Sequence, residues 1–175
     1  MAHAGAPVST SAPQRWQIIL NAAVFQVAWL ACVTGGTTVA LAVTATVLGL
    51  HLWWSSRTGA EAAMLLAALL VGLVCETVLI QAGVLRAPGP LPPVWLLCLW
   101  PLFAATLGLA LRWFRDRPAC AAAGGLLFAP LSYFGGSRLA GIELLTPEWL
   151  ALILIGTVWL FAFPLLTRIH RRLLP

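Results

Sequence analysis

The chain has 175 residues, of which 61% are hydrophobic and only 9% are charged, and its mean hydropathy is +0.96. A water-soluble domain of this size cannot bury so much apolar surface, so the composition excludes a soluble globular protein and indicates an integral membrane protein. All ten basic residues are arginines, and they stand at the ends of apolar segments. A nucleic-acid partner is therefore excluded, because it would need them clustered on one solvated face.

The N-terminal stretch MAHAGAPVSTSAPQ has neither the basic start nor the apolar core of a signal peptide. We expect residues 1–14 to form a disordered tail. Residues 15–168 are expected to form one transmembrane domain, and residues 169–175 a basic cytoplasmic C-terminal tail.

Apolar segments long enough to cross a membrane follow the tail. A spanning helix needs about 20 mostly apolar residues for a ~30 Å hydrocarbon core. Lipid offers the backbone no hydrogen-bond partners, so the spans must be helices. The sequence therefore predicts an all-α integral membrane bundle of six transmembrane helices, with approximate bounds 16–33, 37–54, 62–85, 94–111, 119–138 and 149–167.

The arginines predict the orientation of this bundle, because cytoplasmic loops are enriched in basic residues. Only Arg86 and Arg138 fall on one side of the predicted membrane. Both termini are therefore expected in the cytoplasm, where a basic rim formed by RWFRDRP (112–118) and RIHRRLLP (168–175) would attract anionic lipid headgroups. The arginines on the cytoplasmic side are Arg15, Arg57, Arg112, Arg115, Arg117, Arg168, Arg171 and Arg172.

Glu76 lies inside the third predicted span, slightly outward of its centre. An ionised carboxylate at that depth costs at least ~2.5 kcal/mol. We therefore expect Glu76 to face other helices or to stay protonated. Gly72 shares its helical face and would let a neighbouring helix approach closely.

Other polar residues fall at a similar depth: Gln26 in the first span, and Ser132 and Tyr133 in the fifth. One hypothesis is a polar pocket in the outer half of the bundle, with Glu76 and Tyr133 as catalytic acid–base groups. Gln26, Ser132 and Arg138 would then bind the substrate. The alternative is that these groups only hydrogen-bond across helices and specify packing.

The cysteines and histidines do not fall at the spacing of metal ligands. Cys32, Cys75, Cys98 and Cys120 stand singly in apolar segments, with no CxxC pair. The sequence also contains no Walker loop, dinucleotide-binding glycine motif or HExxH. We expect no disulfide, no metal site and no cofactor.

Several patterns together resemble a known family. They are NAAVFQVAWLACV at 21–33, HLWW at 51–54, PPVWLLCLWPLFAATLGLALRW at 92–113 and PLSYFGGSRLAG at 130–141. They are similar to a bacterial family of small polytopic inner-membrane proteins catalogued only as a domain of unknown function. The resemblance implies a multi-pass location in the bacterial inner (cytoplasmic) membrane.

Two positions depart from the pattern of that family. Its members often have an aspartate where this chain has Glu76, and usually an asparagine where it has Gly108. The first difference keeps a carboxyl group, whereas the second removes a polar group near Thr106. Genes of the family often lie among lipid-modifying genes, such as those resembling cyclopropane-fatty-acid synthases, which implies a connection with membrane-lipid metabolism.

Three functions remain open, and the sequence leaves undecided whether the protein is an enzyme. The first is a non-catalytic accessory or scaffold component of membrane-lipid modification, with membrane lipids and a lipid-modifying enzyme as partners. The second is a small membrane enzyme that acts on a lipid with Glu76 as acid or base. The third is a small-molecule or proton-coupled transporter, although no inverted repeat is evident.

Overall fold

The computed structural model describes residues 13–87 and 89–175, so most of the predicted tail at 1–14 lies outside the described residues. Four of its helices are long and apolar enough to cross a membrane: α1 (Arg15–Trp54), α2 (Thr58–Gln81), α4 (Pro118–Ala140) and α5 (Glu148–Leu173). A fifth, shorter helix is α3 (Val94–Ala104). The prediction of a helical protein with several helices that could cross a membrane is confirmed.

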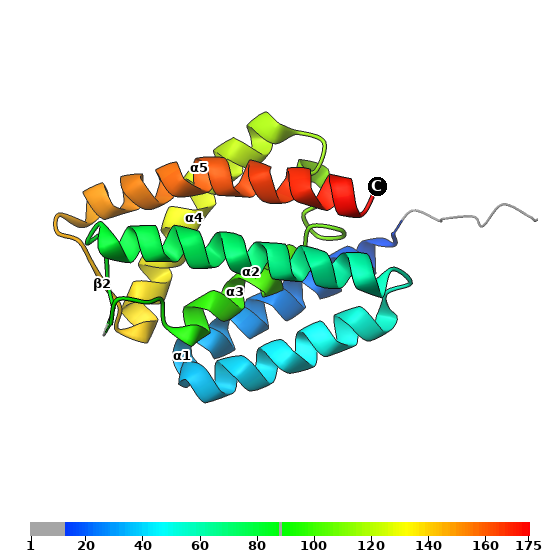
Figure 1. Cartoon of the computed structure of the whole chain (residues 1–175), viewed down its shortest axis with the longest axis horizontal. Helices are drawn as coiled ribbons and strands as arrows, with labels where there is room; N and C mark the ends of the chain where they lie inside the picture. Colours follow the sequence, from blue (N-terminus) through cyan, green and yellow to red (C-terminus); the bar gives the residue numbers. More distant parts are fainter. Residues whose placement is uncertain (1–12, 88) are drawn as a thin grey trace, which may run out of the picture.

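Helix α1 contains both of the first two predicted spans. Its 40 residues are interrupted at Gly36, whose φ of 69° and ψ of −173° are not helical. Glycine is the residue that adopts a positive φ without steric cost. The two arms on either side of Gly36 fold back against each other as a hairpin (Figure 1), and the Cys32 sulfur lies 3.9 Å from the Thr44 hydroxyl across it. The break expected between 33 and 37 is therefore present.

The fourth predicted span, 94–111, is helical only in its first part. Helix α3 ends at Ala104, and its 11 residues cover ~16 Å, about half of the hydrocarbon core. Residues 105–111 form irregular turns before the short 3-10 helix η1 (Arg112–Phe114). The expectation of a continuous helix over 94–111 is wrong.

Asn21 on α1 stabilises this break in α3. Its side-chain nitrogen donates to the carbonyl oxygen of Ala105 at 3.4 Å, and its side-chain oxygen accepts from the backbone N–H of Ala110 at 3.2 Å. Non-helical backbone at membrane depth is tolerated where protein buries it and supplies hydrogen-bond partners. Both polar atoms of the Asn21 side chain are therefore bonded to the backbone of residues 105–111.

A two-stranded antiparallel ribbon joins the connections at one end of the bundle. Strand β1 (Leu85–Arg86) pairs with β2 (Glu143–Leu144), so that Leu85 lies opposite Leu144 and Arg86 opposite Glu143. The two leucines are buried and the charged pair is exposed. The prediction of an all-α chain missed this ribbon, because two-residue strands have no periodicity to read.

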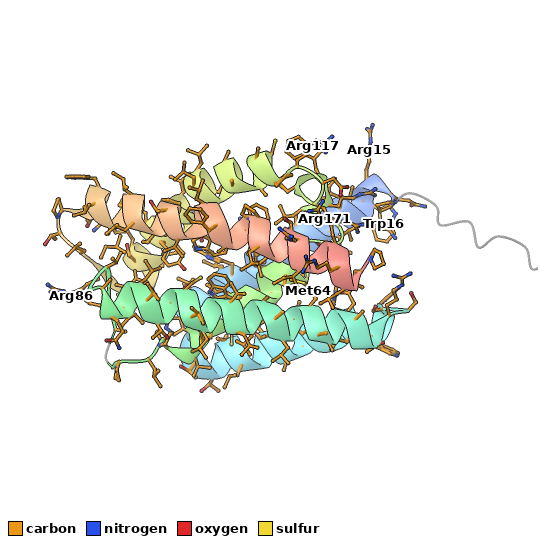
Figure 2. The ribbon with its side chains drawn as sticks, turned by 45° about the horizontal axis from the view of Figure 1, so that its top comes forward. Arg15, Trp16, Met64, Arg86, Arg117 and Arg171 are labelled. Atoms are coloured by element: carbon orange, nitrogen blue, oxygen red, sulfur yellow. The ribbon has the colours of Figure 1, made fainter. Side chains whose placement is uncertain are left out.

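Both ends of the described chain lie at the same end of the bundle. Figure 1 shows the start of α1 beside the C-terminus, on the far side from the ribbon. In Figure 2, Arg15, Arg117 and Arg171 lie at that end and Arg86 lies at the opposite end. These four arginines are thus divided between two ends as they would be between two membrane faces.

Residues 169–175, expected to form a tail, mostly continue α5 to Leu173. Trp159, Phe163 and Leu166 lie on the buried face of α5, and His170 continues that face one turn further. This spacing of three and four residues is that of one helical face. Arg171 and Arg172 are exposed. The segment is therefore the amphipathic end of α5, although its basic composition indicated a tail.

Helices α4 and α5 pack closely through glycines. A Cβ atom added at Gly125 would lie 2.2 Å from the carbonyl oxygen of Trp159, and one added at Gly156 would lie 2.8 Å from that of Leu126. Small residues allow helix backbones to approach in this way in membranes. The contact fixes α5 against the face of α4 that carries Tyr133.

Gly125→Ala is expected to lower the free energy of unfolding by about 1–3 kcal/mol, because the atom that the new methyl group meets belongs to the α5 backbone. Gly49→Ala on α1 is the control, since a Cβ there meets nothing within 4 Å and alanine favours the helix. Unfolding titrations in detergent micelles measure both. Equal stability of the two variants would contradict the close approach of α4 and α5.

Candidate functional site

Glu76 is fully buried on α2 and connects three helices. Trp100 on α3 donates its indole N–H to Glu76 Oε1 at 3.0 Å. Tyr133 on α4 donates its hydroxyl proton to the same oxygen. The carboxyl group therefore faces other helices, as expected for an acidic residue at membrane depth.

Gly72, one turn before Glu76, makes room for Trp100. A Cβ atom at Gly72 would lie 2.2 Å from the indole ring, so only glycine lets the ring reach the carboxyl group. The Trp100 ring also stacks on Trp159 of α5, with centroids 4.7 Å apart and an interplanar angle of 21°. Trp159 in turn donates its N–H to the Tyr133 hydroxyl at 3.4 Å. One connected network thus joins α2, α3, α4 and α5.

A cavity of about 710 Å³ adjoins this network, within the usual size range of ligand sites. Glu76, Trp100 and Tyr133 line it, but most of its wall is aliphatic and aromatic. The exposed lining residues all come from the first arm of α1 and from α4, so the cavity opens sideways between these two helices. These mouth residues are Ala22, Gln26, Phe128, Leu131 and Ser132.

The cavity is elongated along α4. Its lining residues on that helix run from Gly124 to Ser137, and a rise of ~1.5 Å per residue makes this stretch ~20 Å long. Leu144 of the ribbon lines one end, and Phe114 of η1 lines the other. The shape suits a long, narrow, apolar ligand.

The second oxygen of Glu76, Oε2, is buried and has no hydrogen-bond partner among the described residues. A buried polar atom without a partner costs free energy, and native proteins leave few of them. This one belongs to a side chain that lines the cavity. A ligand hydroxyl could donate to it or, with Glu76 protonated at Oε2, a ligand carbonyl could accept from it.

The structure brings together four of the five residues considered from the sequence. Glu76 and Tyr133 lie at the inner wall of the cavity, and Gln26 and Ser132 lie at its mouth. Arg138 is not among the lining residues. An arginine at a helix end pairs with a carboxylate that the fold brings close to it, and the sequence does not show which carboxylate that is.

Arg138 binds both carboxylate oxygens of Glu148 through Nη2, at 2.9 and 2.8 Å, and its guanidinium group lies over the Phe134 ring. Both charged side chains are well exposed. Arg138 therefore ties the end of α4 to the start of α5, away from Glu76.

Trp100 and Trp159 are partners of the site that were not expected from the sequence. A signal was available, because each indole lies inside an apolar segment, where its N–H needs a partner that lipid cannot provide. Gly72, at one helical turn from Glu76, was the local sign that a bulky ring would pack there. Which ring it was could not be read from the sequence.

The site offers carboxyl, phenol and indole groups to a ligand. In the described ranges, 13–87 and 89–175, no group of three His, Cys, Asp or Glu side chains is placed to hold a metal ion. Within the described residues, Oε2 of Glu76 is the polar atom of this network that is free to bond a ligand, and Glu76 with Tyr133 could exchange a proton with a bound molecule.

Comparison with known proteins gives a family but no activity. Residues 18–165 match the family described as "Protein of unknown function (DUF2878)", and the chain belongs to it. This confirms the resemblance to a family of unknown function. No curated protein and no solved structure matches the chain.

Tyr133→Phe is expected to lower the free energy of unfolding by about 0.6 kcal/mol, the average for a hydrogen bond between membrane helices, and by no more than about 1.7 kcal/mol. The same change should cost markedly less in a Glu76→Leu background, where the acceptor is absent. Glu76→Gln, which keeps an acceptor oxygen, is the conservative control. Unfolding titrations of the single and double variants form a double-mutant cycle, and a coupling energy near zero would contradict the bond.

Proposed function

We propose that this member of the DUF2878 family is a six-pass membrane protein that holds a lipid chain in the cavity beside Glu76. In this proposal it is a non-catalytic component of membrane-lipid modification. The observation that carries the proposal is an apolar cavity, open sideways between α1 and α4, whose wall contains one buried carboxyl oxygen that no described residue hydrogen-bonds.

The proposed topology counts each arm of α1 as one crossing. The third, fifth and sixth crossings are α2, α4 and α5, and the fourth is α3 together with residues 105–111. The arginines gathered around the start of α1 and the end of α5 support a cytoplasmic position for both termini. The bacterial inner membrane is the proposed location.

A lipid fits the access route better than a water-soluble molecule does. The mouth of the cavity is formed by transmembrane helices, and three of its five residues, Ala22, Phe128 and Leu131, are apolar. A lipid chain enters such an opening directly from the bilayer, without passing through water. Its apolar surface is then transferred from one apolar environment to another, so packing and the few polar contacts decide the affinity.

Glu76 supplies the polar contact. It lies about one and a half helical turns before the end of α2, or ~7.5 Å along the axis, so its level is below the membrane surface. The ester groups of a glycerolipid lie near the boundary of the hydrocarbon core. We assign the free Oε2 to a polar lipid group in that region: it accepts from a hydroxyl or, with Glu76 protonated at Oε2, donates to an ester carbonyl.

The basic rim is the proposed contact with anionic headgroups on the cytoplasmic side. A lipid-modifying enzyme is the proposed protein partner there. In that arrangement the protein would hold or present a lipid, and the partner would carry out the chemistry.

A second candidate is an enzyme that acts on the bound lipid. Glu76 and Tyr133 are hydrogen-bonded to each other and both line the cavity, which is the placement of an acid–base pair. A transporter has less support: the break after α3 is the feature that transporters use for binding, but here Asn21 occupies the carbonyl of Ala105 and the N–H of Ala110.

Gly136→Phe is expected to displace the bound lipid, because Gly136 lines the cavity and a Cβ there has one neighbour, a Trp29 atom at 3.9 Å. Gly135→Phe is the matched control, since Gly135 has the same Trp29 contact distance but does not line the cavity. Native mass spectrometry of protein extracted in mild detergent counts bound lipid. Equal lipid content in wild type and both variants would contradict the assignment of the cavity.

The two candidates differ in what Glu76→Gln does in cells. For a lipid-holding component, the amide keeps a hydrogen-bonding oxygen, and a deletion strain carrying this variant should have wild-type lipids. For an enzyme, comparative lipidomics should show a species that changes on deletion and that wild type, but not Glu76→Gln, restores. Lipids that stay unchanged on deletion under every growth condition would remove the enzyme candidate.

A further inference from the structure

A second, smaller hollow lies at the ribbon end of the bundle. Its volume is about 300 Å³, and it shares Trp95 and Ile142 with the large cavity. The two hollows therefore adjoin each other at these two side chains. The remaining residues of the small hollow are Arg86, Ala87, Pro93, Ala140, Gly141 and Glu143.

The small hollow contains one charge of each sign. Arg86 and Glu143 lie opposite each other in the ribbon, and Arg86 Nη1 is 3.4 Å from Glu143 Oε2. Both side chains are about two-thirds exposed. An exposed pair at this distance contributes little to stability, so ligand charges can replace the partners at low cost.

The two hollows together match an amphipathic ligand: the long apolar cavity suits an acyl chain, and the small hollow at one end of it presents charged groups. We infer that the small hollow binds the zwitterionic headgroup of a phospholipid, with Arg86 on its phosphate and Glu143 on its ammonium group. This inference rests on the proposed function, because it requires the lipid's chain to lie in the large cavity.

The charge of the hollow selects among headgroups. Arginine matches phosphate geometry through paired N–H donors. A headgroup with phosphate alone would bring a negative charge to Glu143, and a headgroup with an amine alone would bring a positive charge to Arg86. A phosphate followed by a primary ammonium satisfies both, so phosphatidylethanolamine fits better than phosphatidylglycerol.

A second ion pair at the same end provides a matched control. Arg138 and Glu148 are also exposed and paired, at 2.8 Å, but neither lines either hollow. Substitutions there change the charge of the same end of the molecule by the same amount. They separate an effect of the small hollow from an effect of overall charge.

The experiment uses the full chain in detergent micelles and compares phosphatidylethanolamine with phosphatidylglycerol of identical acyl chains, by native mass spectrometry. Wild type should bind phosphatidylethanolamine about 2- to 5-fold more tightly, as one exposed charge contact allows. Glu143→Gln should shift the preference toward phosphatidylglycerol, and Arg86→Gln should weaken both lipids. Glu148→Gln and Arg138→Gln should leave the ratio unchanged.

The failures of this inference and of the proposed function are distinguishable. Equal binding of the two lipids, with Gly136→Phe still displacing them, overturns the headgroup site and leaves the lipid cavity in place. Lipid binding that Gly136→Phe does not reduce overturns both. Soluble glycerophosphoethanolamine has the same headgroup without acyl chains, so it should compete only weakly, and competition as strong as that of the whole lipid would overturn the assignment to a phospholipid.

Discussion

Trp100 and Tyr133, from two different helices, donate an N–H and an O–H to one carboxyl oxygen, Oε1 of Glu76, which the fold buries completely. The arrangement needs Gly72, because any side chain there would occupy the space of the Trp100 ring. It also extends to α5, through the stack of Trp100 on Trp159. A single buried acid thus holds four helices in one relative position.

The same arrangement leaves the cavity open. Trp100, Trp159 and Tyr133 are held by their hydrogen bonds and by stacking, so they form a fixed wall. On α4, the lining positions Gly124 and Gly136 carry no side chain that could fill the space. Small-molecule sites usually consist of an apolar cavity with a few fixed polar groups in its wall.

Packing and binding need not be alternatives for the polar residues of this bundle. Both polar side-chain atoms of Asn21, the amide nitrogen and oxygen, hydrogen-bond the irregular segment after α3. We therefore assign this residue to helix packing only. The two carboxyl oxygens of Glu76 have different roles. Oε1 accepts hydrogen bonds from two other helices, whereas Oε2 is buried and without a partner among the residues that the structure describes. The satisfied oxygen fixes the geometry, and the free oxygen is the group available to a ligand.

The sequence determined the features that depend on local physics. Hydropathy predicted the apolar helices and the break between residues 33 and 37, and the position of Glu76 inside an apolar segment predicted that it faces other helices. Only the tertiary structure decided that α3 ends at Ala104, that Arg138 pairs with Glu148, and that Glu76 meets Trp100 and Tyr133. Transfer from water to lipid is a property of each segment by itself. Hydrogen-bond partners 24 and 57 residues apart depend instead on how whole helices are placed against each other.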